Sequence, residues 1–116
     1  MTIETNQKVN LICEAAYDRK AEEIVIIEMQ QKSSICDFFI VMSAPSSVRV
    51  KAIVDHIEDT MKKHDMPVRH REGLQEGMWV LLDFGQVVVH VFYHEKRKFY
   101  DLENLWGDAK KRNYIH

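Results

Sequence analysis

The stretch MWVLLDFGQVVVHVFY, residues 78–93, decides the fold of this 116-residue chain. Two apolar runs rich in β-branched and aromatic residues flank Gly85, and a glycine at a tight turn between such runs is typical of a β-hairpin. The sequence therefore predicts antiparallel strands at 78–84 and 86–93. Because apolar side chains occur on both faces of these strands, we expect other parts of the chain to cover both faces.

The rest of the chain alternates helical and extended patterns. Apolar residues that recur every three or four positions indicate amphipathic helices, and short β-branched runs indicate buried strands. Ser46 or Ser47 can cap the longer helix, and Pro67 ends it. The predicted elements are helices at 6–19 and 47–64, strands at 23–29, 38–42 and 68–71 (the last at a sheet edge), a short polar helix at 94–106 and a loose basic end at 110–114.

This order predicts the α/β class, with one mixed sheet of about five strands and helices packed on it. The strands before and after the long helix can pair in parallel through a crossover, whereas the hairpin must be antiparallel. The length fits one domain. We expect that domain to span residues 1–109 and a basic tail to follow at 110–116.

Composition excludes several classes of protein. The chain has 16 basic and 18 acidic side chains, so it is not a nucleic-acid-coating protein. Residues 1–93 carry 10 basic and 14 acidic side chains, a net −4, and residues 94–116 carry 6 and 4, a net +2. The chain begins with no leader pattern and has no apolar run of membrane-spanning length, which predicts a cytoplasmic protein without a membrane contact. Cys13 and Cys36 are expected to be free thiols.

No pattern for catalysis emerges. The loop at 42–47 contains no glycine, so it cannot be a phosphate-binding loop, and Asp37 has no nearby carboxylate with which to hold a catalytic metal ion. The six histidines lack zinc-ligand spacing. We therefore predict no enzymatic activity, no metal site and no cofactor. A degenerate nucleotidyltransferase-like domain that binds a nucleotide or RNA at Ser43–Ser47 remains the alternative function.

A protein-binding surface is the better hypothesis. Strand alternation places Trp79, Leu81 and Asp83 on one face, and His90 alternates with its valine neighbours on the partner strand. Together with the aromatic segment 99–106, these side chains would suit a protein partner. The alternative, that the aromatic side chains simply close the core, stays open from the pattern alone.

The hairpin is one of several segments that closely resemble the ribosomal silencing factor family, also called the Iojap or YbeB family. The others are DFFIV at 37–41, VKAIVDHI at 50–57 and RKFYDLENLWGDA at 97–109, so the resemblance covers residues 7–109. One departure is the turn Asp83-Phe84-Gly85-Gln86, where the family usually has Asp-Tyr-Gly-Asp. The resemblance implies a mixed α/β sheet similar to the nucleotidyltransferase fold but without its catalytic carboxylates.

The resemblance also implies a function. Members of the family bind the large ribosomal subunit through its ribosomal protein L14 and block joining of the small subunit, which represses translation when nutrients are short. Aromatic anchors and acidic side chains would suit a basic ribosomal protein, and the basic tail would allow a peripheral contact with ribosomal RNA. An exposed apolar surface would also allow a homodimer of the free chain. The expected partner-binding residues are Trp79, Leu81, Asp83, His90, Tyr100, Asp101, Leu102 and Trp106.

Overall fold

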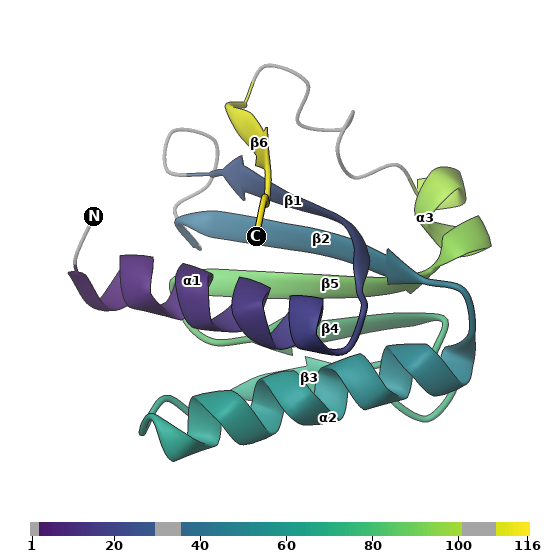
Figure 1. The fold of residues 1–116 in the computed structure, drawn as a ribbon, viewed down its shortest axis with the longest axis horizontal. Helices are drawn as coiled ribbons and strands as arrows, with labels where there is room; N and C mark the ends of the chain where they lie inside the picture. Colours follow the sequence, from purple (N-terminus) through teal and green to yellow (C-terminus); the bar gives the residue numbers. More distant parts are fainter. Residues whose placement is uncertain (1–2, 30–35, 101–108) are drawn as a thin grey trace.

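A computed structural model describes residues 3–29, 36–100 and 109–116. Within these residues, one mixed sheet with the strand order β3-β4-β5-β2-β1-β6 forms the centre of the fold (Figure 1). The elements are α1 (Ile3–Asp18), β1 (Glu22–Glu28), β2 (Phe38–Ala44), α2 (Ser47–Lys63), β3 (His70–Glu72), β4 (Trp79–Asp83), β5 (Val87–Tyr93), α3 (His94–Tyr100) and β6 (Lys111–Asn113). The predicted α/β class and mixed sheet are confirmed.

The sheet contains both antiparallel and parallel strand pairs. β4 and β5 form the predicted antiparallel hairpin, with Gly85 in the left-handed conformation at its turn. β2 pairs in parallel with β5, from Phe38 opposite Val87 to Ala44 opposite Tyr93. The connection from β2 to β5 runs through α2, β3 and β4, so the strand that directly follows the long helix, β3, is not the parallel partner of β2 that the sequence led us to expect. The polar strand β3 lies at one edge of the sheet, as predicted, and it pairs with β4.

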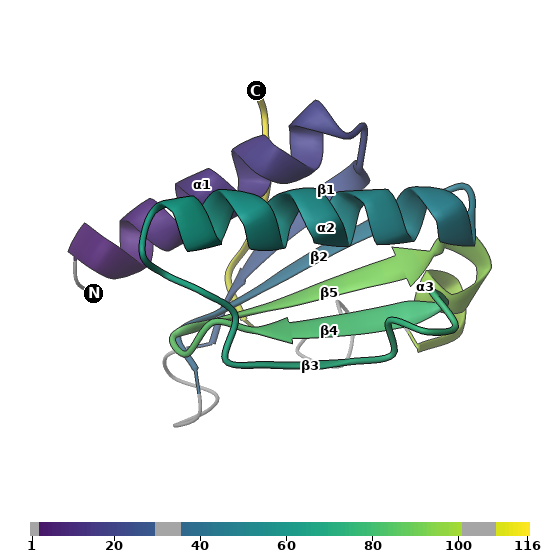
Figure 2. The same cartoon turned by 90° about the horizontal axis from the view of Figure 1, so that it is seen from below.

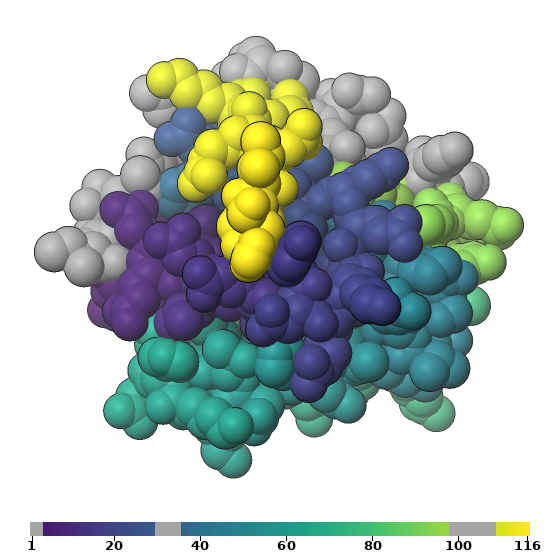
Figure 3. All heavy atoms as spheres, viewed as in Figure 1, coloured from purple at the N-terminus to yellow at the C-terminus, as the bar shows by residue number. Residues whose placement is uncertain are grey.

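The C-terminal segment differs from the prediction, and the expectation that it is loose is wrong. Residues 111–113 form β6, a sixth strand that pairs antiparallel with β1, and the Tyr114 N–H donates to the Ile24 carbonyl at 2.9 Å. Without β6 the edge of β1 would leave backbone groups unpaired. His116 then stacks on Tyr17 of α1 with ring centroids 4.0 Å apart, and Figure 3 shows the C-terminal segment lying across α1. The domain boundary at residue 109 stays a prediction.

Helices α1 and α2 lie side by side on the same face of the sheet (Figure 2). The predicted apolar stripe of α2, from Val50 to Met61, is fully buried there. Ser46 caps the helix, and its hydroxyl accepts the Arg49 N–H at 3.1 Å. The core on this face includes Ile12, Ala16, Ile26, Ile40, Ile53, Ile57, Leu82 and Val89.

One buried cation ties α1 to the hairpin turn. Lys8 is 4% exposed, and its Nζ donates to the Phe84 carbonyl at 2.8 Å and to Gln86 Oε1 at 2.7 Å. Glu4 lies 3.7 Å away on the same helix. Gln86 stands where the resembled family usually has an acidic residue, so here a neutral amide accepts the lysine.

We expect Lys8→Met to lower the free energy of unfolding by roughly 2 kcal/mol, because hydrogen bonds to a charged donor are lost and the Phe84 carbonyl stays buried. Urea denaturation measures this change. The control Lys63→Met removes an exposed lysine that pairs with Asp59 at 3.1 Å, and it should cost less than about 0.5 kcal/mol. Equal losses in the two variants would show that Lys8 adds nothing beyond a surface contact.

Candidate docking surface

The face of the sheet opposite α1 and α2 carries a cluster of aromatic side chains. We call it the aromatic face and define it as Phe39, Trp79, Leu81, His90 and Phe92. Phe39, Trp79 and Leu81 are half-buried, and they pack on a second core cluster. That cluster consists of Val25, Ile27, Met29, Cys36, Val41, Val88 and Phe92.

Strand register brings the predicted residues of β4 and β5 together. Trp79 lies opposite Phe92, Leu81 opposite His90, and Asp83 opposite Val88. The Trp79 and Phe92 rings stack with centroids 5.1 Å apart and planes 22° apart. This geometry confirms the predicted alternation along the hairpin, which places Trp79, Leu81 and His90 on one face.

His90 lies deeper than a contact residue would. Its side chain is 4% exposed, and its ring meets Phe39 edge-on with centroids 4.7 Å apart. Its Nδ1 accepts the indole N–H of Trp79 at 3.1 Å. Burial lowers the pKa of His90 to about 4, so its ring is neutral at physiological pH. Direct contact between His90 and a partner stays a prediction.

Asp83 has a local structural partner. Its Oδ1 accepts the Gly85 N–H at 2.7 Å, which closes the turn between β4 and β5. The carboxylate is half-buried on the same face as Trp79 and Leu81. It is therefore held at the end of the aromatic face, where a basic partner side chain could reach it.

The other predicted contacts are not placed. Asp101, Leu102 and Trp106 lie outside the described residues, and Tyr100 is the last residue of α3. Sequence reasoning missed Phe39, which reaches this face because β2 pairs with β5. The alternation of Phe38 and Ile40 with Phe39 and Val41 was a signal for which face of its own strand Phe39 occupies, but it does not show that β2 pairs with β5.

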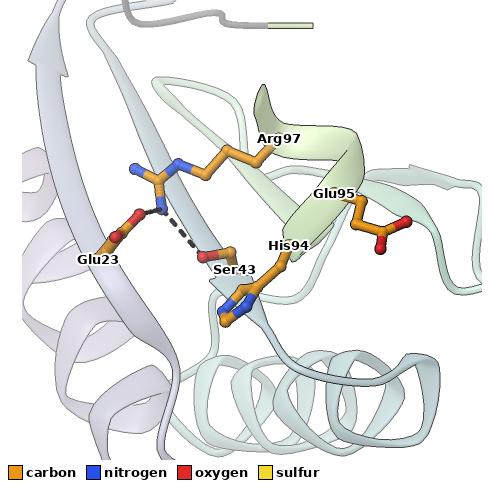
Figure 4. Close-up of a pocket in the computed structure, with 5 residues that line it drawn as sticks. All are labelled: Glu23, Ser43, His94, Glu95 and Arg97. Carbon is orange, nitrogen blue, oxygen red and sulfur yellow. Dashed lines mark hydrogen bonds and ion pairs between the residues drawn. The ribbon is translucent and has the colours of Figure 1, made fainter. Parts of the chain in front are cut away.

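A small polar pocket lies at the carboxyl ends of the parallel strands β2 and β5 (Figure 4). It has a volume of about 210 Å³ and is lined by Glu23, Ser43, His94, Glu95 and Arg97. The buried Arg97 Nη1 donates to Ser43 Oγ at 3.2 Å and lies 3.7 Å from the Glu23 carboxylate. The guanidinium is already engaged by Ser43 and by the Glu23 carboxylate, while the Glu95 carboxylate points away from it (Figure 4), so this pocket is unfavourable for a phosphate. The contacts instead tie α3 to β1 and β2.

Within the described residues, no group of three His, Cys, Asp or Glu side chains is arranged to hold a metal ion. No helix among those residues has the length and apolarity needed to cross a membrane. Cys13 and Cys36 are both buried free thiols, as predicted. Burial raises the pKa of Cys36 to about 11, so its thiol is protonated and unreactive at neutral pH.

The fold and this face define a small α/β domain that presents the half-buried side chains of Phe39, Trp79 and Leu81 on one face of its sheet. The chain belongs to the ribosomal silencing factor family, as its sequence predicts. The family described as ribosomal silencing factor during starvation matches residues 2–115.

Individual relatives match most of the chain. It is 40% identical over 106 residues to ribosomal silencing factor RsfS of Bacillus subtilis, covering 90% of each protein. It is 34% identical over 98 residues to the chloroplastic protein Iojap of Zea mays, covering 84% of this chain and 42% of that one. A crystal structure of a protein from Chromobacterium violaceum is 32% identical, with a TM-score of 0.86 over 100% of this chain and 95% of the other.

Proposed function

We propose that this chain binds the large ribosomal subunit through ribosomal protein L14 and blocks association with the small subunit, so that translation is repressed in the cytoplasm when nutrients are limiting. The aromatic face is the proposed docking surface. The observation that carries this proposal is that Trp79 and Leu81 lie half-buried on the sheet face opposite α1 and α2. The proposal also rests on the family to which the chain belongs.

Steric occlusion needs only a rigid body and one strong contact. The hairpin supplies rigidity, because Trp79 and Leu81 lie on a strand between β3 and β5 rather than on a loop. Tryptophan is the residue type most often found as an energetic anchor in protein interfaces. The net −4 charge of residues 1–93 would attract a partner with a basic surface, and Asp83 is the nearest carboxylate on β4.

We expect Trp79→Ala to weaken binding to the large subunit by about 2 kcal/mol or more, close to thirtyfold in Kd, while the fold survives. The reason is the loss of a large half-buried ring that would be fully buried in the complex. Binding is measured by sedimentation of labelled protein with purified large subunits. Circular dichroism confirms that the variant is folded.

The matched control for this variant is Val48→Ala. Val48 is an apolar residue that is 77% exposed on α2, which packs on the other face of the sheet. Its replacement should leave the affinity unchanged. A folded Trp79→Ala variant that binds as tightly as the wild type would remove the aromatic face from the proposal.

Occlusion is tested separately from binding. Large subunits are first saturated with the protein, small subunits are then added, and the joined ribosome is resolved by sucrose gradient. The proposed mechanism requires that joining falls with wild-type protein and recovers with Trp79→Ala. Joining that proceeds normally on saturated large subunits would leave binding intact and disprove occlusion.

The C-terminal residues contribute a second, weaker contact in this proposal. Lys110, Lys111 and Arg112 are exposed at the sheet edge formed by β6, where they could meet ribosomal RNA. Two free chains could also pair through the aromatic face, and such a homodimer would compete with the ribosome for that face. Analytical ultracentrifugation with and without large subunits tests this competition.

A further inference from the structure

We infer that His90 is the positioning residue of the aromatic face, holding the Trp79 indole in the orientation in which that face docks. The effect on ribosome binding that we expect from this inference rests on the proposed function. The hydrogen bond and ring geometry on which it stands belong to the free protein and can be measured there.

Two contacts within the described part of the chain hold the indole of Trp79. Its ring stacks on Phe92 of the neighbouring strand, and its Nε1–H donates to His90 Nδ1 at 3.1 Å. His90 lies two residues from Phe92, so the two contacts act on different parts of the indole. Rotation of the indole away from the sheet would break both contacts. Because the N–H is directed at His90, a partner would meet the ring of Trp79 and not its polar atom.

The same hydrogen bond fixes the tautomer of His90. An Nδ1 atom that accepts a hydrogen bond in a neutral ring leaves the proton on Nε2. Nε2 is buried and has no hydrogen-bond partner among the residues that the structure describes. A buried donor without a partner destabilises the fold.

The unpaired Nε2–H indicates that packing alone does not explain a histidine at position 90. A phenylalanine at position 90 would keep a ring against Phe39 and would carry no unpaired donor. Packing alone therefore favours an apolar ring at this place. What the imidazole supplies and a phenylalanine ring would not is the acceptor for Trp79, so the geometry assigns that role to His90.

Two substitutions separate the acceptor from the ring. His90→Phe keeps the ring and removes the acceptor. His90→Asn removes the ring but keeps an acceptor, since asparagine Oδ1 is as many bonds from Cα as histidine Nδ1. We expect His90→Phe to bind large subunits about five- to tenfold more weakly than wild type, the equivalent of one lost hydrogen bond, and His90→Asn to bind within about twofold.

The two variants should rank in the opposite order by stability to their order by affinity. The His90→Asn variant leaves a cavity and is expected to unfold at a lower urea concentration than the His90→Phe variant. Binding is measured where both variants are folded. If the more stable variant binds more weakly, positioning is supported. If affinity instead follows stability, with His90→Asn the weaker binder, His90 acts only through packing and the inference is overturned.

A measurement on the free protein keeps this test independent of the ribosome. In ¹⁵N-labelled protein, the indole N–H resonance of Trp79 is assigned with Trp79→Phe, and the ring nitrogens of His90 report the tautomer. We expect the Nε2–H tautomer in wild type and a shifted indole resonance in His90→Phe. An indole resonance unchanged by His90→Phe would overturn the inference even if wild type binds ribosomes. If wild type does not bind them, the proposed function fails while this assignment can still hold.

Discussion

Gly73→Ala is expected to lower the free energy of unfolding by about 3 kcal/mol or more. A Cβ atom at Gly73 would lie 2.0 Å from the carbonyl oxygen of Trp79 and 3.1 Å from its carbonyl carbon. Both atoms belong to the backbone of β4, so a side-chain rotation cannot relieve the overlap. Gly73 also has a φ of +84°, which is unfavourable for alanine.

Gly85→Ala is the matched control, because Gly85 has a similar φ of +90°. The three atoms nearest to a Cβ there belong to the guanidinium end of Arg69, at 2.9 to 3.3 Å, and that flexible end can move away. We expect a loss of about 1 kcal/mol, due to the backbone conformation alone. Guanidinium chloride denaturation compares the two variants. A loss at Gly73 no larger than that at Gly85 would contradict a rigid contact with Trp79.

The contact at Gly73 links the stability of the loop to the candidate site. The residue whose carbonyl would be struck, Trp79, is the proposed anchor of the docking surface. The main chain of Trp79 lies close against Gly73, and its side chain is held by Phe92 and His90. A Gly73→Ala variant that still folds should bind ribosomes more weakly through the displaced indole.

Much of the fold could be predicted because burial imposes a period on the sequence. The stripe of α2 repeats every three or four residues, and the hairpin around Gly85 combines alternation with a turn residue. β6 could not be predicted in this way. Its three exposed residues, Lys111 to Asn113, carry no apolar pattern, and their conformation depends on backbone pairing with β1.

The candidate site could be predicted only in part, for a similar reason. Alternation assigned Trp79, Leu81 and Asp83 to one face, and the structure places them there. Alternation gives the face of a residue but not its depth, so the burial of His90 was not evident. Phe39 joins the face through a parallel pairing between strands far apart in the sequence, with Val41 opposite His90. Spacing along the chain cannot reveal such a pairing.

Acid is expected to destabilise this protein through His90. Burial lowers the pKa of His90 from 6.5 to about 4 in the folded chain. Between these two values the unfolded chain binds the proton more strongly than the folded chain does, so protonation favours unfolding. The contribution of His90 to stability is complete above pH 6.5 and is lost as the pH falls toward 4. The loss is about 2 kcal/mol at pH 5 and roughly 3 kcal/mol at pH 4 and below.

The His90→Phe variant isolates this contribution from that of the carboxylates, which also titrate in acid. Free energies of unfolding are measured by urea denaturation from pH 7 to pH 4 for wild type and variant. The difference between the two should grow in favour of the variant as the pH falls, since only wild type has a buried imidazole to protonate. Protonation of the folded chain would also remove the acceptor for the Trp79 indole, so its N–H resonance should move only as the pH approaches 4. Parallel stability curves would mean that burial does not lower the pKa of His90.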